Sequence, residues 1–111
     1  MSANTLIYHF ARPEDWQAAQ ASGEYLPREY KAEGFIHCAT EAQIAGVVAR
    51  HLRGGGQRLQ LSIDAIALGD ALHYEWSEAS QDLYPHVYGA IPLSAVMAVT
   101  AFDPDTAVAL P

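Results

Sequence analysis

Helix-forming patterns cluster in the first half of this 111-residue chain, and most strand-forming patterns lie in the second half. Helical spacing and capping residues predict two helices, 13–22 and 41–52, both in the first half. The strands predicted from β-rich or alternating apolar residues are 5–10, 35–38, 58–64, 71–76, 87–91 and 96–102. This segregation favours an α+β fold with a mainly antiparallel sheet over an alternating parallel one. At this length we expect a single domain, 1–111.

The ends of both predicted helices carry local signals. Pro13 suits a first helical turn, and Gly23 follows the last. Thr40 with Gln43 three residues later forms a capping-box pattern for the second helix, and the three glycines from Gly54 end it.

The segment 34–40 contains a histidine that core packing does not require. Strand alternation places Phe35 and His37 on one face and Ile36 and Cys38 on the other. If the second pair enters the core, His37 shares its face with an aromatic ring, as in a ligand site or at the edge of a core. Near a buried face an imidazole needs a hydrogen-bond partner, so we expect a polar group opposite His37.

Further candidates for chemistry lie outside this segment. His9 ends the first predicted strand, and Glu75 is predicted to lie on a strand alongside His73. His86 and Tyr88 belong to an aromatic stretch with Pro and Gly, which predicts a rigid turn. Each has a structural alternative, since such side chains also occur as ordinary surface residues.

The net charge of −7 restricts the partners. All six basic residues lie within the first 58 positions, so no basic stripe is available for a phosphate backbone, and we expect no nucleic-acid partner. A small anion bound by the first half is compatible with this distribution. No apolar run could span a bilayer, and one cysteine with no signal-peptide pattern predicts a cytoplasmic protein. No paired metal-ligand motif occurs, so no metal is expected. The oligomeric state stays open.

Several segments together resemble the small bacterial proteins grouped as domain of unknown function 952. The matching residues are Tyr8-His9, Trp16, Gly34-Phe35-Ile36-His37-Cys38, Tyr74-Glu75 and Tyr84-Pro85-His86-Val87-Tyr88. This resemblance extends over nearly the whole chain.

The layout also resembles a compact ADP-ribosyltransferase fold, with a split, mainly antiparallel sheet. By this resemblance His9 is the ribose-binding residue and His37 takes the second motif position, which is Tyr or His in that superfamily. The third position, a glutamate in many transferases, has no counterpart in 84–88. His86 is the nearest polar group there, and Glu75 is a conjectured substitute from another strand.

The resemblance implies a domain that binds NAD, ADP-ribose or a related small phosphorylated nucleoside. NAD would then be a substrate whose N-glycosidic bond is transferred or hydrolysed, or the reaction would resemble that of a phosphotransferase, with His37 and either His86 or Glu75 catalytic. The expected ligand contacts are His9, Arg12, Arg28, Phe35, Thr40 and Tyr88: imidazoles on ribose, arginines on phosphate and rings on a base. The alternatives are a non-catalytic binding module that lacks the transferase glutamate and a protein-interaction module that uses exposed aromatic residues.

Overall fold

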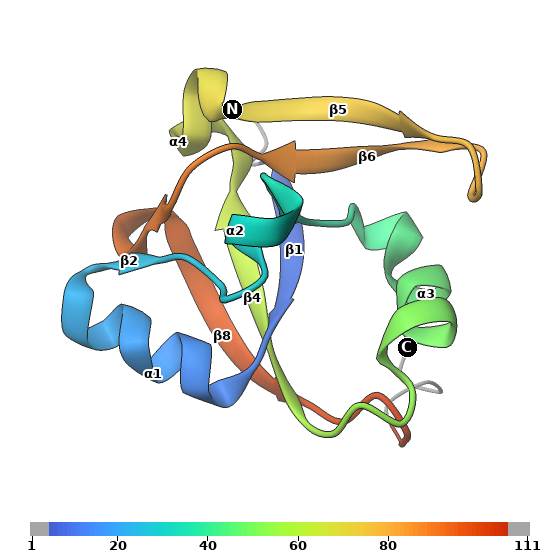
Figure 1. Ribbon diagram of the computed structural model, residues 1–111, viewed down its shortest axis with the longest axis horizontal. Coiled ribbons are helices and arrows are strands. Elements are labelled where there is room, and N and C mark those ends of the chain that lie inside the picture. Colours follow the sequence, from blue (N-terminus) through green and yellow to red (C-terminus); the bar gives the residue numbers. More distant parts are fainter. Residues whose placement is uncertain (1–4, 107–111) are drawn as a thin grey trace.

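The computed structural model describes residues 5–106 as antiparallel strands with short helices (Figure 1). The strands are β1 (Leu6–Ala11), β2 (Glu24–Tyr25), β3 (Ile36–His37), β4 (Arg58–Asp64), β5 (Leu72–Ser77), β6 (Asp82–Val87), β7 (Ile91–Pro92) and β8 (Val96–Phe102). The α-helices are α1 (Pro13–Ser22), α2 (Tyr30–Glu33), α3 (Ile44–Val47) and α4 (Ala65–Leu68). Every strand pair is antiparallel, which confirms the predicted α+β class.

Two three-stranded sheets and one two-stranded sheet form the framework. Their strand orders are β1-β4-β8, β3-β6-β5 and β2-β7. In Figure 1 the β5–β6 hairpin lies crosswise above the first sheet. The two larger sheets meet at Tyr8 and Ala39, whose backbones exchange two hydrogen bonds of 2.8 Å. This bridge places the beginning of β1 beside the segment that follows β3.

The first predicted helix matches α1 at both ends. Pro13 occupies its first turn, where the missing N–H would have no helical partner. Gly23 closes the helix with φ +94°, and its N–H donates to the Ala19 carbonyl at 2.8 Å. A left-handed residue at this position favours glycine because a side chain would be strained there.

The second predicted helix, 41–52, is helical throughout but changes its winding. It starts as a 3₁₀ turn (Glu41–Gln43), continues as α3 and ends as a π turn (Val48–Leu52). Gly46 and the adjacent valines favour a regular α-helix less than most residues, which fits this irregularity. The buried Gln43 anchors its beginning, accepting a hydrogen bond from the Thr40 N–H and donating to Asp82 and to the Leu83 carbonyl.

The core lies between the sheets and is mainly aliphatic. Its largest fully buried side chains include Tyr25, Ile7, Ile36, Leu61, Ile63, Ile91 and Val87. Ile36 and Cys38 are buried while Phe35 is half-buried and His37 is exposed, which confirms the predicted division of faces in this segment.

The region 82–92 corrects two predictions. His86 lies in strand β6 rather than in a turn, and the strand predicted over 87–91 is absent because β6 ends at Val87 and β7 begins at Ile91. Strand β6 was missed in the sequence because it contains Pro85, and proline is unusual in a central strand such as β6. The Pro85 carbonyl accepts a hydrogen bond from the Cys38 N–H at 3.0 Å, so the backbone of Pro85 faces the end of β3. The N–H that proline lacks would point to the same side, so its absence costs no hydrogen bond between β6 and β5.

Candidate functional site

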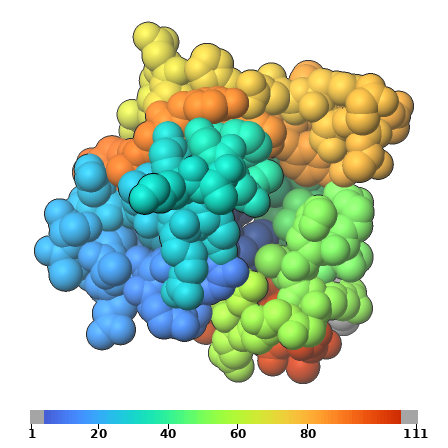
Figure 2. Space-filling view, viewed as in Figure 1, coloured from blue at the N-terminus to red at the C-terminus, as the bar shows by residue number. Residues whose placement is uncertain are grey.

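A groove of about 810 Å³ separates the two larger sheets. Its lining includes residues of β1, of the segment 27–39, of the helical segment after Gln43 and of the β5–β6 hairpin. Figure 2 shows a hollow between the cyan and green segments, below the orange strand, with blue atoms of β1 deep inside it. Segments far apart in the sequence therefore meet around one concave surface.

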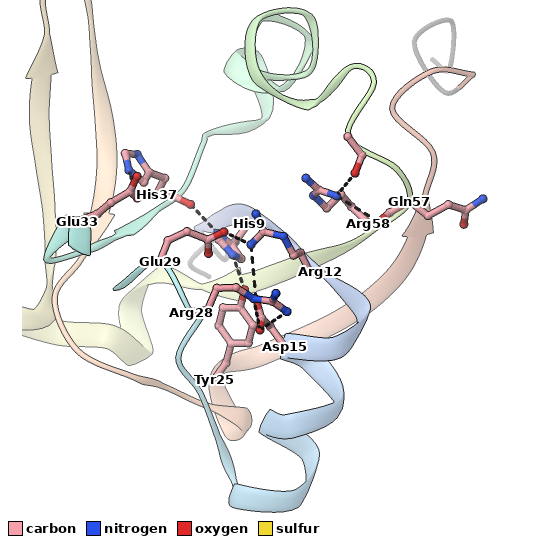
Figure 3. A network of polar contacts seen from close by, with 11 residues as sticks. His9, Arg12, Asp15, Tyr25, Arg28, Glu29, Glu33, His37, Gln57 and Arg58 are labelled. Atoms are coloured by element: carbon pink, nitrogen blue, oxygen red, sulfur yellow. Dashed lines mark hydrogen bonds and ion pairs between the residues drawn. The ribbon is translucent and has the colours of Figure 1, made fainter. Parts of the chain in front are cut away.

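His9 lies in β1 and lines this groove with both ring nitrogens occupied (Figure 3). Its Nδ1 is 2.6 Å from the His37 carbonyl, which can only accept, so Nδ1 carries the hydrogen. Its Nε2 is 2.7 Å from the Tyr25 hydroxyl and accepts that hydrogen bond. Burial lowers the pKa of His9 to about 4, so the ring is neutral at pH 7. His9 thus joins three elements at the floor of the groove.

The two arginines predicted to bind phosphate are paired with carboxylates. Arg12 contacts Glu29 and lies 3.8 Å from Asp15, and Arg28 reaches Asp15 at 3.3 Å. Figure 3 shows these side chains gathered near His9. Arg12 lines the groove whereas Arg28 lies outside it, so this cluster ties α1 to the segment 27–33 and leaves little free positive charge there.

His37 stands at the groove wall with a carboxylate behind it. Its Nε2 is 2.8 Å from Oε1 of Glu33, and its ring lies 4.6 Å from Phe35 between centroids. Gly34 ends α2 with φ +84°, which reverses the chain and allows Glu33 to reach a residue four positions later. A polar group thus lies beside His37 as expected, although the ring is exposed and its burial does not require one.

His86 has a carboxylate partner on the neighbouring strand. Its Nδ1 is 2.7 Å from Oε1 of Glu75, and the same oxygen accepts a hydrogen bond of 2.6 Å from the Tyr88 hydroxyl. The hydrogen bonds from Tyr88 and then His86 lower the pKa of Glu75. The hydrogen bond to Glu75 in turn raises the pKa of the Tyr88 hydroxyl. Glu75 is therefore an anion that orients the His86 ring.

The two carboxylate-bound imidazoles are direct neighbours. His37 and His86 are register partners of β3 and β6, with ring centroids 5.5 Å apart. Phe35 stacks on the His86 ring at 4.0 Å with an angle of 19° between the planes. All three rings line the groove and form its aromatic wall.

Sequence reasoning missed two groove arginines, Arg50 and Arg58. Arg50 donates to the Tyr84 hydroxyl at 2.7 Å, and Arg58 donates to the Gly55 carbonyl at 2.7 Å. Within residues 5–106 neither guanidinium has a carboxylate within ion-pair distance. Whether an arginine has an acidic neighbour depends on the tertiary structure, so no local sequence pattern could have identified these two.

Of the residues predicted for the site, five line the groove and four do not. The groove contains His9, Arg12, Phe35, His37 and His86. Glu75 and Tyr88 stand behind His86, while Arg28 and Thr40 lie away from the groove. Cys38 also lines the groove, but burial raises the pKa of its thiol, which leaves it a weak nucleophile.

Two further findings concern cofactors and membranes. Among the residues that the structure describes, no three His, Cys, Asp or Glu side chains gather as a metal site would require. No helix within 5–106 combines the length and apolar character needed to cross a bilayer.

Known structures resemble this fold closely. The crystal structure of protein CC0527 from Caulobacter crescentus matches with a TM-score of 0.81 and 31% identity, covering 89% of this chain and 87% of that one. The solution structure of CC0527 matches with a TM-score of 0.75 and 30% identity, covering 88% and 84% of the two chains. A comparison with curated proteins found no significant match.

The family comparison agrees with the resemblance noted from the sequence. The model of the family described as "Protein of unknown function (DUF952)" matches residues 10–99, which include the groove residues of β3 and β6. On this match the chain belongs to the DUF952 family.

Proposed function

We propose that the groove binds a small phosphorylated nucleoside such as NAD or ADP-ribose. The observation that carries this proposal is an aromatic wall around one groove, together with two arginines that have no carboxylate partner among residues 5–106. Phe35 offers a ring on which a base can stack. Arg50 and Arg58 offer guanidinium groups that can bind phosphate oxygens through paired hydrogen bonds. The volume, about 810 Å³, suits a ligand of this size.

The proposal includes an ADP-ribosyltransferase-like arrangement, with histidines on two strands at one groove. The hydrogen bond between His9 and the His37 carbonyl supports it, because the two motif positions meet there. A ribose hydroxyl can reach His9 Nε2 only in exchange for the Tyr25 hydroxyl. We therefore propose that the aromatic wall and the two arginines make the main ligand contacts. His9 would shape the floor of the groove without binding the ligand directly.

One observation favours a second function, binding without ribosyl transfer. Glu75, the conjectured substitute for the transferase glutamate, lies behind His86 and does not line the groove. The groove carboxylates are already engaged: Asp15 with Arg28, Glu29 with Arg12, and Glu33 with His37. On this alternative the protein protects NAD or ADP-ribose instead of consuming it.

Calorimetric titration with NAD, ADP-ribose and mononucleotides tests the binding proposal. We expect Arg50→Gln and Phe35→Ala each to weaken binding by about 10- to 100-fold, since each removes a contact of about 1–3 kcal/mol. Arg53→Gln is the matched control, because Arg53 is an exposed arginine outside the groove and its loss should leave affinity unchanged. Absence of binding heat with every ligand refutes the proposal.

Nicotinamide release separates the two functions. The protein is incubated with NAD, and free nicotinamide is measured by chromatography. A transferase or glycohydrolase releases nicotinamide in a time-dependent manner, whereas a binding module leaves NAD intact at concentrations where calorimetry detects the complex.

A further inference from the structure

The groove presents two neighbouring histidines, each beside a carboxylate. His37 binds Glu33 through Nε2 at 2.8 Å, and His86 binds Glu75 through Nδ1 at 2.7 Å. Because a carboxylate only accepts hydrogen bonds, the Nδ1 of His86, which is bonded to Glu75, carries a hydrogen. Within the described part of the chain, Nδ1 of His37 and Nε2 of His86 have no hydrogen-bond partner. Each imidazole therefore keeps one nitrogen available for proton transfer.

The two rings lie close enough to serve one reacting group. Their centroids are 5.5 Å apart and their planes differ by 71°, and both side chains line the groove. The stacked Phe35 ring restrains His86, and the hydrogen bond from Nδ1 to Glu75 fixes the orientation of that ring. A fixed pair of this kind can remove one proton and deliver another across a small substrate.

We propose that His37 and His86 are an acid–base pair that hydrolyses a cyclic phosphodiester on the ribose of a small nucleotide. One imidazole, neutral, takes a proton from water as the water oxygen bonds to phosphorus. The bond between phosphorus and one ribose oxygen breaks, and the second imidazole, protonated, gives its proton to that oxygen. One water is consumed, a ribose monophosphate forms, and exchange with solvent returns both rings to their starting states.

The surroundings favour phosphorus over the glycosidic carbon as the reacting centre. Cleavage of a P–O bond needs both a base and an acid, which the imidazole pair supplies. An oxocarbenium centre needs a free anion, whereas the groove carboxylates are engaged with Arg12, Arg28 and His37. Arg50 bonds to Tyr84, which lies two residues before His86 in β6, and so can reach a phosphate beside the pair.

The acid–base proposal rests on the proposed function for its ligand class, a small nucleotide. The experiment below distinguishes failure of hydrolysis from failure of binding. The full chain is incubated with adenosine 2′,3′-cyclic phosphate and the other three 2′,3′-cyclic nucleotides, and monophosphate formation is followed by chromatography and phosphorus NMR. We expect turnover by the wild type and a loss of at least about 100-fold in kcat for His37→Asn and for His86→Asn. Arg53→Gln, which replaces an exposed arginine outside the groove, should keep wild-type activity.

Two positioning residues supply a second test that leaves the imidazoles in place. Glu33→Gln and Glu75→Gln keep a hydrogen-bond acceptor but remove the negative charge, so kcat should fall about 10-fold with KM unchanged. A melting curve by circular dichroism checks that each variant is folded. A merely structural role would change thermal stability and leave kcat per folded molecule intact.

The outcomes are distinguishable. Nucleotide binding without hydrolysis of any cyclic nucleotide overturns the acid–base proposal and leaves the binding function standing. Absence of both binding and hydrolysis overturns both. Hydrolysis that persists in His37→Asn and His86→Asn shows that this pair is not responsible and also overturns the proposal.

Discussion

Acidification should destabilise the protein through His9, whose pKa is lowered to about 4, mainly by burial. In the unfolded chain the imidazole has its ordinary pKa of 6.5, so between pH 6.5 and pH 4 the unfolded state binds a proton that the folded state does not. This contribution to stability is fully present above pH 6.5 and is lost as the pH falls through 4. The difference of about 2.5 pKa units corresponds to about 3 kcal/mol.

Comparison with His9→Asn isolates this contribution. The Asn amide can still donate to the His37 carbonyl but does not titrate, so the variant should lose about 3 kcal/mol less stability than the wild type between pH 7 and pH 4. The assay is urea unfolding followed by far-UV circular dichroism at both pH values. The carboxyls of Glu75 and Asp82, whose pKa values are lowered by hydrogen bonds, titrate in both proteins and cancel in the difference.

The charged and titratable groups around His9 are the same in the two proteins. They are Arg12, Asp15, Tyr25 and His37. Equal losses of stability for the wild type and the variant would mean that the folded imidazole titrates near its ordinary pKa, and the account of a neutral, desolvated His9 would then be wrong.

Three substitutions test the packing and hydrogen bonding around the groove, each by urea unfolding at pH 7. Tyr25→Phe removes the donor to His9 Nε2 and should cost about 1–2 kcal/mol, because a half-buried nitrogen loses its partner; an unchanged midpoint would contradict the hydrogen bond. Gln43→Ala removes three hydrogen bonds and should cost about 2–3 kcal/mol, whereas the exposed Glu41→Ala should cost less than about 0.5. Ile36→Ala empties a fully buried site and should cost about 2–5 kcal/mol; a smaller loss would mean that the neighbouring side chains close the cavity.

Local signals predicted those parts of the fold that local interactions determine. The helix at Pro13–Ser22 and the strands at Arg58–Asp64 and Val96–Phe102 have the predicted bounds, because capping residues and alternation mark their ends. The strand through Pro85 was missed because proline is unusual in a central strand. Pro85 is tolerated because it lies opposite the end of the short partner strand β3, and this position is known only from the strand order of the folded sheet.

The sequence predicted the histidines of the site better than their partners. The need for a polar group beside His37 followed from its strand, but Glu33 lies across a chain reversal at Gly34 that periodicity cannot describe. The contact between His86 and Glu75 depends on the register of β5 against β6, in which Glu75 pairs with Tyr84. Register and tertiary approach are long-range properties, so these pairs emerge only from the folded structure.

The short bridge between Tyr8 and Ala39 has a consequence for local opening. It joins the edges of two sheets that otherwise carry separate hydrogen-bond ladders, and the floor of the groove lies beside it. Opening of the groove by separation of the sheets must break both bridge hydrogen bonds, so the Tyr8 and Ala39 amides report that motion directly in hydrogen exchange. A ligand that spans the groove holds the sheets together and should slow the exchange of these two amides before it affects those inside either sheet.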